Sequence, residues 1–371
     1  MSLMMVEWKG AVMAASTLRT RIGGRLLPWL ALGAAASTLG AAAVLAPAAA
    51  HAAPVPVPIC NEMGGQAGPD VAGSMVVWTD NRNGNLDIYG RNLSTRTNVA
   101  VCTNDAQQDN PSIARVVEAD GTHFVAVWLD ARNHSGGDAT DIYGRDITAK
   151  NNFVVARSAS AKWYPEIVDN WVVWLEGDSW AGPFRVKARD LTAAKTYLIA
   201  TTKTLSPVAV DSRTVGTETV YTAVYTSGVG DISGRDLPRG TPFVVSQSSK
   251  FEWMPDISHD RVVWWEDGGR IMLKDLASGK RSFVHLGSRP RIDHDLVVWD
   301  GGGHGGSFTI DYTPDAKVYV RNLAGSAKPV VIAQPHLTCL FPAVSGTRVV
   351  WESGPAKRVL SHIHIYGVTV R

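Results

Sequence analysis

Short apolar stretches separated by Gly-, Asn- and Asp-rich turns recur along the chain from residue 55 to its end. The first full unit, Pro69 to Leu93, reads PDVAGSMVVWTDNRNGNLDIYGRNL. It combines Pro-x-Ile/Val, a short polar turn, Val-Val-Trp, an acidic loop, and Asp-Ile-Tyr-x-Arg-Asp-Leu. Related units begin at Pro111, Pro165, Pro207, Pro255, Pro290 and Pro342. The pattern predicts a repeat architecture made of strands.

Each unit is expected to form four short strands. In the first unit they cover Pro69–Ala72, Met75–Thr79, Asp87–Leu93 and Asn98–Cys102. The first two strands are joined by a two-residue turn whose residue types tolerate positive φ: Gly73-Ser74, then Asp169-Asn170, His259-Asp260, His294-Asp295 and Gly346-Thr347. Strand-like units spaced irregularly around roughly 45 residues are typical of a β-propeller with one unit per blade.

An aromatic residue ends the Val-Val-Trp segment of every unit. The position holds Trp78, Trp128, Trp174, Trp264, Trp299 and Trp351, with Tyr225 in the fourth unit. We expect these rings to fill the wedge between neighbouring blades as core residues. Burying each ring is worth at most about 4–6 kcal/mol of apolar transfer free energy.

The two ends of the repeat region predict how the ring closes. Val55 to Cys60 resembles the fourth strand of a unit, whereas the seventh unit stops after its third strand, Ile363 to Val370. The N-terminal strand should therefore complete the last blade and remove an open sheet edge. This gives an all-β fold of seven four-stranded blades. Six blades is the alternative, because the fifth unit is short and the fourth lacks its Trp.

The combination of Pro-x-Ile, Val-Val-Trp, an Asp-rich turn and Asp-Ile-Tyr-x-Arg-Asp-Leu resembles the repeats of TolB-like β-propellers. The resemblance covers Val55 to Arg371. It implies the propeller fold and leaves the activity open, since such propellers serve as interaction scaffolds, carbohydrate-active enzymes and accessory domains of peptidases. The Ser-Pro-Asp-Gly usual after the first strand is missing here.

The first 53 residues read as a targeting segment that precedes a propeller domain at 54–371. Arg19, Arg21 and Arg25 form a basic flank, and Leu26 to Ala50 contains no charged residue. We expect a cleaved signal peptide and a secreted, extracellular or envelope protein with no remaining membrane span. An uncleaved anchor that makes the protein an envelope scaffold is the alternative. Of the net charge of +2, the leader contributes +3 and the remainder −1, and a near-neutral remainder argues against nucleic acid as a partner.

The chain has three cysteines, Cys60, Cys102 and Cys339. Cys60 and Cys102 each lie nine residues before a repeat proline. Equivalent positions on neighbouring blades should exceed the roughly 7 Å Cα limit of a disulfide, so we predict no bond between them. Pairing of Cys339 with either one stays open.

The loops that precede each repeat proline and those between the second and third strands should gather on one face of the ring. We expect a ligand or partner site there, since loops on a rigid scaffold commonly bind. The candidate residues are Trp163, Tyr164, Trp253, Arg289, Phe341, His304, Arg82 and Arg132. The alternative is that the aromatic residues only plug gaps between blades. Asp80-x-Arg82-Asn83 and Asp130-x-Arg132-Asn133 equally suit a role in tying off their own turns.

The residues that directly follow repeat prolines are expected to start the innermost strands and to line the channel mouth. They include Asp70, Glu166, Asp256 and Arg291. Three carboxylates on a ring could hold a divalent ion such as calcium, but a solvated channel lining is the preferred interpretation. The segment Asp80 to Asp87 is a weak match to a calcium loop, because Arg82 occupies a ligand position. No metal or cofactor is therefore assigned.

We interpret the protein as a binding or protein-interaction module, with an unidentified protein or glycan as its partner. The alternative is an extracellular carbohydrate-active hydrolase or lyase that uses carboxylates at the channel mouth. Such enzymes need two carboxyl groups about 5–9 Å apart. No His-Glu-x-x-His, Gly-x-Ser-x-Gly or phosphate-binding Gly loop occurs in the sequence.

Overall fold

The structure, a computed structural model, describes residues 55–135, 139–301, 316–325, 328–333, 337–355 and 362–370. Every described residue belongs to one compact unit, Ala53–Arg371. Regular structure in these ranges is all strand. None of the described segments forms a helix with the length and apolar character needed to cross a bilayer.

The strands follow one another in seven groups along the chain, with bounds as follows: β1 (Val57–Cys60); β2 (Gln66–Ala72), β3 (Met75–Asp80), β4 (Asp87–Asn92), β5 (Thr97–Cys102); β6 (Gln108–Glu118), β7 (Gly121–Asp130), β8 (Asp141–Asp146), β9 (Asn151–Ala156); β10 (Ala161–Val168), β11 (Trp171–Gly177), β12 (Phe184–Asp190), β13 (Lys195–Thr202); β14 (Ala209–Val215), β15 (Glu218–Ser227), β16 (Asp231–Asp236), β17 (Phe243–Ser246); β18 (Glu252–Ser258), β19 (Arg261–Glu266), β20 (Arg270–Asp275), β21 (Arg281–Leu286); β22 (Ser288–Asp293), β23 (Leu296–Gly301), β24 (Lys317–Asn322), β25 (Val330–Val331); β26 (Thr338–Ser345), β27 (Arg348–Gly354) and β28 (His364–Thr369).

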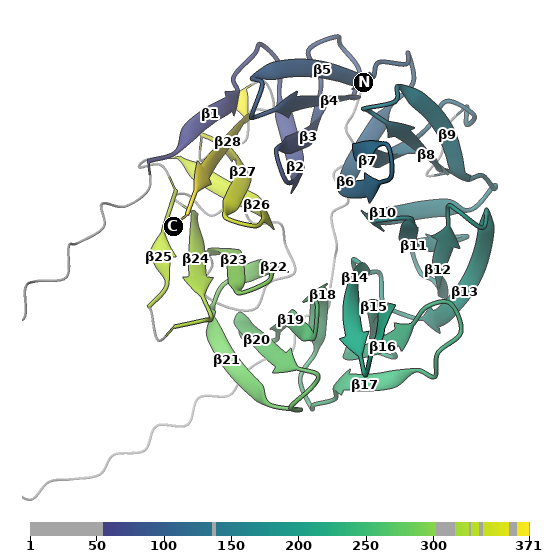
Figure 1. Cartoon of the computed structure of the whole chain (residues 1–371), viewed down its shortest axis with the longest axis vertical. Helices are drawn as coiled ribbons and strands as arrows, with labels where there is room; N and C mark the ends of the chain where they lie inside the picture. The colour runs from purple at the N-terminus through teal and green to yellow at the C-terminus, as the bar shows by residue number, and fades with distance from the viewer. Residues whose placement is uncertain are drawn as a thin grey trace, which may run out of the picture. The chain divides into compact units, whose positions relative to one another are not determined.

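These strands form seven four-stranded antiparallel sheets, which surround a central channel as the blades of a propeller (Figure 1). Blades 1 to 6 are β2–β5, β6–β9, β10–β13, β14–β17, β18–β21 and β22–β25, each in chain order from the channel outwards. The seven-bladed fold expected from the repeat and from the resemblance to TolB-like propellers is confirmed, and the six-bladed alternative is wrong.

Blade 7 joins the two ends of the propeller. Its strand order is β1-β28-β27-β26, so the first strand of the domain forms the outer strand of the last blade. Val57 pairs with Gly367 and Pro58 with Tyr366. The predicted closure is confirmed: this pairing covers the edge of β28 that would otherwise stay open.

The core lies between blades. Seven clusters of buried apolar residues are seen among the described residues, and each combines side chains from two neighbouring blades. The repeated aromatic residue is 4% exposed or less in every blade, as predicted: Trp78, Trp128, Trp174, Tyr225, Trp264, Trp299 and Trp351. The stability of the ring therefore rests on contacts between blades, since a single twisted sheet cannot bury these rings.

In six blades the innermost strand is longer than the sequence suggested, because it runs through its repeat proline rather than starting there; in blade 4, β14 begins at Ala209, after Pro207. In blade 1, β2 begins at Gln66, and its pairing with β3 shifts between Ala67 and Asp70. Five other blades show the same shift at the proline. A bulge accommodates proline within a strand, since its missing N–H needs no ladder partner there.

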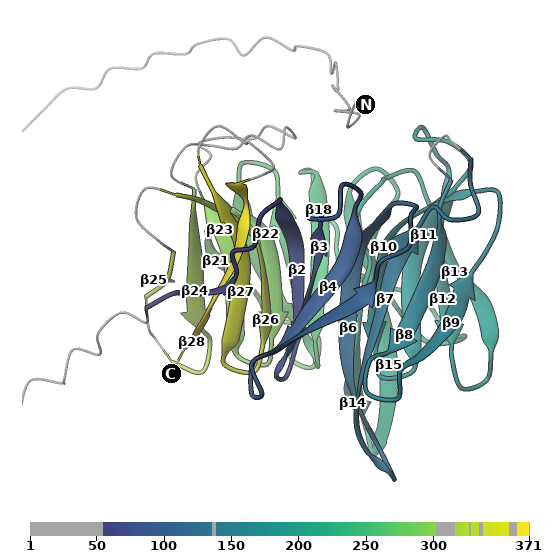
Figure 2. The same ribbon diagram turned by 90° about the horizontal axis from the view of Figure 1, so that it is seen from above.

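The innermost strands define two faces of the ring. We call the side with the two-residue turns between the first and second strands the turn face. The opposite side, with the loops that precede the prolines, is the loop face. The first residue of five of these turns has φ between 46° and 57°, as the residue types predicted. The β6–β7 hairpin is longer than its counterpart β2–β3 and extends beyond neighbouring blades on the turn face (Figure 2).

Candidate functional site

The residue before the repeat proline has an unusual backbone conformation in all blades but the fourth. It lies at positive φ in six blades: Gly68, Asn110, Tyr164, Met254, Arg289 and Phe341. A non-glycine residue in this region costs roughly 1–2 kcal/mol, and such strain often marks functional sites. Here the conformation repeats with the bulge in blade after blade, so it belongs first to the architecture.

Acceptors from the neighbouring blade stabilise several of these strained residues. The Asp300 carboxylate accepts a bond from the backbone N–H of Phe341 at 3.1 Å and binds Arg289 through two bonds of 2.7 and 2.9 Å. The Arg289 guanidinium lies 4.5 Å from the centre of the Phe341 ring. Arg289 and Phe341, which the sequence predicted, thus form one cluster with Asp300 between blades 6 and 7.

Two other predicted tryptophans also lie between blades. Trp163 is 7% exposed and contacts Trp180 and Phe184 with ring centroids 5.1 and 5.5 Å apart. The Trp253 indole N–H donates to the Leu205 carbonyl of blade 4 at 3.1 Å. Trp163 belongs to the buried cluster shared by blades 3 and 4, and Trp253 packs against the cluster of blades 5 and 6. Both rings therefore pack within the propeller, and a further role in ligand binding stays a prediction. Trp180, at 42% exposure, is the aromatic residue that presents surface to solvent here.

Arg82 and Arg132 form two copies of one local network. The Arg82 guanidinium makes two bonds to Asp80, at 2.9 and 2.6 Å, and stacks 4.2 Å above the Tyr89 ring. In the next blade Arg132 binds Asp130 in the same way, at 2.8 and 2.6 Å. Asp80 and Asp130 are fully buried, so each arginine neutralises a buried carboxylate and ties off its own turn.

The same two arginines contact cysteines. Arg82 Nη2 lies 3.3 Å from Cys60 Sγ, and Arg132 Nη2 lies 3.2 Å from Cys102 Sγ. Burial raises the pKa of both thiols. Cys60 and Cys102 are thiols in the structure, in accord with their predicted separation, and Cys339 Sγ lies 3.3 Å from Ser353 Oγ.

Basic side chains of the third strands connect neighbouring blades in four places. They donate to a backbone carbonyl on the outer strand of the preceding blade. Arg145 binds the Val101 carbonyl, Arg235 that of Ile199, and Arg321 that of Val284. Lys274 makes the same contact with Val245. These side chains link the outer parts of neighbouring blades.

The residues that follow the repeat prolines lie inside the channel rather than at the start of their strands, which corrects the sequence expectation. The reason is that the strand already begins before the proline and continues through it by way of the bulge. Glu166, Asp256 and Arg291 line a channel cavity of about 280 Å³. Asp70 lies on the same ring of positions on β2 but is not part of the cavity lining.

Channel side chains connect every blade to the next one. At each of the seven junctions, a carboxylate or hydroxyl on one innermost strand accepts a bond from a backbone N–H of the following blade, at 2.5 to 3.3 Å. The acceptors and donors are Asp70 and Ile113, Ser112 and Ile167, Glu166 and Val210, Asp211 and His259, Asp256 and Ile292, Asp293 and Gly346, and Ser345 and Gly73. These bonds satisfy backbone donors that no sheet partner reaches.

One arginine crosses the channel. The Arg291 guanidinium of blade 6 donates to Glu166 of blade 3 at 3.1 Å and lies 3.5 Å from Asp256 of blade 5. Burial raises the pKa of Glu166 from 4.5 to about 7, although Arg291 opposes the shift. Burial also raises the pKa of Asp256. The cluster therefore holds a carboxyl group that can take up a proton near neutral pH.

A second cavity, of about 560 Å³, opens on the turn face. Its walls come from the extended β6–β7 hairpin of blade 2, the turns of blade 3 and Tyr221 of blade 4. It shares Arg115 and Asp169 with the channel cavity. The sequence did not point to this groove. One feature of the sequence could have indicated the groove. The alternating apolar and polar residues of β6 continue for longer than the innermost strand of a blade requires.

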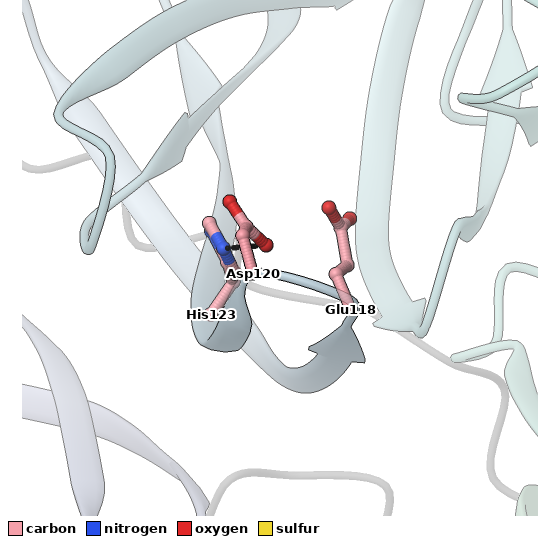
Figure 3. Close-up of side chains that lie close together, drawn as sticks. All are labelled: Glu118, Asp120 and His123. Atoms are coloured by element: carbon pink, nitrogen blue, oxygen red, sulfur yellow. Dashed lines mark hydrogen bonds and ion pairs between the residues drawn. The ribbon is translucent and has the colours of Figure 1, made fainter.

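The tip of the same hairpin carries a group of potential metal ligands. Glu118, Asp120 and His123 offer ligand atoms within 4.8 Å of one another (Figure 3). His123 is already bound on both ring nitrogens, by Asp146 at 2.6 Å and by Asp120 at 3.0 Å, and these bonds raise its pKa. A cation would have to displace this pairing, so the group is better described as a charged hairpin tip.

His304 lies outside the described residues. The other predicted site residues thus fall into separate groups rather than one site. Arg289 and Phe341 are together, Trp163 and Tyr164 belong to blade 3, and Glu166, Asp256 and Arg291 share the channel. Whether the loop-face residues bind a ligand stays a prediction.

No family model and no curated protein matches this sequence. Solved structures match the fold across most of the chain. Oligogalacturonate lyase from Vibrio parahaemolyticus is 11% identical, with a TM-score of 0.58 over 85% of this chain and 93% of that one. The propeller domain of the trilobed protease from Pyrococcus furiosus is 12% identical, with a TM-score of 0.53 over 83% and 94%.

Puromycin hydrolase is 13% identical, with a TM-score of 0.55, and the match covers 80% of this chain but 51% of that one. At such identities the similarity shows the propeller fold alone. The Pyrococcus furiosus propeller is described as having an open velcro topology, whereas β1 completes blade 7 here.

Proposed function

We propose that the protein is a secreted binding module that presents loop-face side chains on a rigid ring. The channel bonds between blades carry this proposal. Asp70, Glu166, Asp211 and Asp256, the carboxylates that would serve an acid–base mechanism, each accept a backbone N–H of the following blade. A carboxylate used this way holds the scaffold together, and recognition then falls to side chains at the rim.

Capture of partners from culture supernatant and envelope fractions tests the proposal. Trp180→Ala removes the exposed aromatic ring of the loop face, and Val215→Ala removes an exposed apolar side chain of the turn face as the matched control. We expect a partner that is retained by the wild type and by Val215→Ala but depleted with Trp180→Ala. Equal retention by all three would contradict recognition through this part of the loop face.

A carbohydrate-active hydrolase or lyase is the second candidate, and the raised pKa of Glu166 favours it. Glu166, whose pKa is raised to about 7, lies near the Asp256 carboxylate, and a carboxyl group with such a pKa suits the role of a general acid. A panel of polysaccharides, assayed for new reducing ends and for unsaturated sugars, separates the two functions. Turnover that is lost in Glu166→Gln would establish the enzyme, and binding without turnover supports the module.

A further inference from the structure

The turn-face groove has one wall made of strand backbone. Four consecutive residues of β6, Arg115 to Glu118, line the 560 Å³ cavity. Successive side chains of a strand point to opposite faces, so a cavity that touches four in a row lies along the strand's edge. The floor is formed by the two turns of blade 3 at Asp169-Asn170 and at Asp190 to Ala193.

The backbone groups along this edge face away from β7. Glu118 and Gly121 flank a two-residue turn, so they form a hydrogen-bonded pair, and the pairs alternate from there. Val117 opposite Thr122 and Arg115 opposite Phe124 are therefore non-hydrogen-bonded pairs. Phe124 confirms this register, because its N–H donates to Thr148 Oγ1 and its carbonyl accepts from Ile147.

The N–H and C=O groups of Arg115 and Val117 consequently point into the groove. The sheet order places no further strand beyond β6. Val117 is 68% exposed. An exposed edge of this kind is where an extended peptide adds as a further strand, through main-chain bonds at every second residue.

The groove is acidic. Glu118, Asp169 and Asp190 line it against a single cation, Arg115. Asp169 accepts a bond from the Tyr221 hydroxyl at 2.9 Å, and Asp190 accepts bonds from the backbone of Thr192 and Ala193. Tyr221 adds an aromatic ring, which attracts cations over its face.

We propose that this groove binds an extended peptide segment carrying a basic side chain. The segment pairs with β6 through the backbone of Arg115 and Val117. Its Lys or Arg side chain reaches the carboxylates of Glu118 on the β6 wall and Asp169 on the floor. The proposal rests on the role as a binding module but uses a surface on the opposite face from the loop-face site, so the two can be tested separately.

The test uses three peptides of equal length with a fluorescent label: Gly-Lys-Val-Arg-Val-Lys-Gly, the same peptide with Glu at each basic position, and the basic peptide with Pro for its central Arg. Binding is measured by fluorescence anisotropy at low and moderate salt. We expect the basic peptide to bind, with an affinity that falls as salt rises. The acidic and Pro-containing peptides should bind at least about tenfold more weakly.

Two sets of variants test the two contacts. Val117→Pro removes an outward N–H and leaves the pairing with β7 intact, so binding should fall at least about tenfold. Thr214→Pro is the control, since Thr214 opposite Thr219 holds the equivalent outward position on the β14–β15 hairpin. Glu118→Gln with Asp169→Asn should weaken binding similarly, with Glu218→Gln as its control. Unfolding curves check that each variant is folded.

The proposal is overturned if the basic peptide does not bind at millimolar concentration, or if folded Val117→Pro binds it as the wild type does. Equal binding of the acidic peptide would overturn the charge argument. A chitosan oligomer that binds equally to wild type and Val117→Pro, and displaces the peptide, would identify a cationic glycan site instead. Trp180→Ala should leave peptide binding unchanged, so failure here is distinguishable from failure of the loop-face site.

Discussion

Lys162 is a buried cation whose position in the repeat explains its surroundings. It lies three residues before Pro165, where the first two blades have Gln66 and Gln108. Those amides donate to carbonyls of the preceding loop. The Lys162 ammonium does the same, with bonds of 2.8 Å to Thr140, 3.0 Å to the Ser160 carbonyl and 3.0 Å to Ser158 Oγ. Burial lowers its pKa.

Replacing Lys162 by Met should lower the free energy of unfolding by roughly 3 kcal/mol, because buried acceptors lose their only charged donor. Lys162→Gln restores the residue type of the first two blades and should lose about 1 kcal/mol. Urea denaturation of both variants measures the difference. Equal losses would show that the amide cannot reach the same carbonyls.

Glu166 gives the fold a pH dependence with a defined sign. Its pKa in the folded protein is raised from 4.5 to about 7, so the folded state binds the proton more tightly than the unfolded chain. Stability contributed by this proton is present below pH 4.5 and is lost as pH rises to 7. Between about pH 5 and pH 7.5 the wild type should therefore lose up to roughly 3 kcal/mol more than Glu166→Gln. Parallel profiles of the two proteins would contradict the assigned shift.

Individual strands show what repeat patterns can and cannot predict. The Val-Val-Trp segments and the two-residue turns were predicted because their hydrophobic alternation and turn chemistry are local. The bulge at each proline was missed, since a proline reads as a strand boundary when nothing shows that its N–H has no partner. The channel bonds were out of reach for another reason. They depend on how far one blade is shifted against the next, which no single repeat encodes.

The outer links between blades lead to a prediction with an internal control. Arg145→Met removes the bond to the Val101 carbonyl of the preceding blade and should cost about 1–2 kcal/mol of unfolding free energy. Arg91 holds the equivalent position in blade 1 but binds Asn98 of its own blade at 3.1 Å. Arg91→Met should cost less than about 0.5 kcal/mol. Chemical denaturation measures both, and equal costs would remove the distinction between links within and between blades.

At the scale of the whole molecule, the seven blades and their closure followed from the sequence. The sequence has seven repeat units, the last of which lacks its fourth strand, and one additional strand before the first unit. Only pairing of this strand with the last unit gives a ring without an open sheet edge. The candidate site did not follow in the same way. The contacts of Arg82, Arg132, Trp163 and Trp253 described above lie within the propeller, and their role in ligand binding stays a prediction. The turn-face groove appeared only when the β6–β7 hairpin was seen to extend past its neighbours.

Hydrogen–deuterium exchange on the propeller with and without residues 55–60 tests the closed ring most directly. β1 pairs with β28, and Ile59 packs with Val71, Trp78 and Ile365 at the junction of blades 7 and 1. Without β1, the β28 amides that face it should exchange much faster, while those of blades 3 to 5 keep their protection. Unchanged protection of β28 in the shortened chain would contradict the closure on which the account depends.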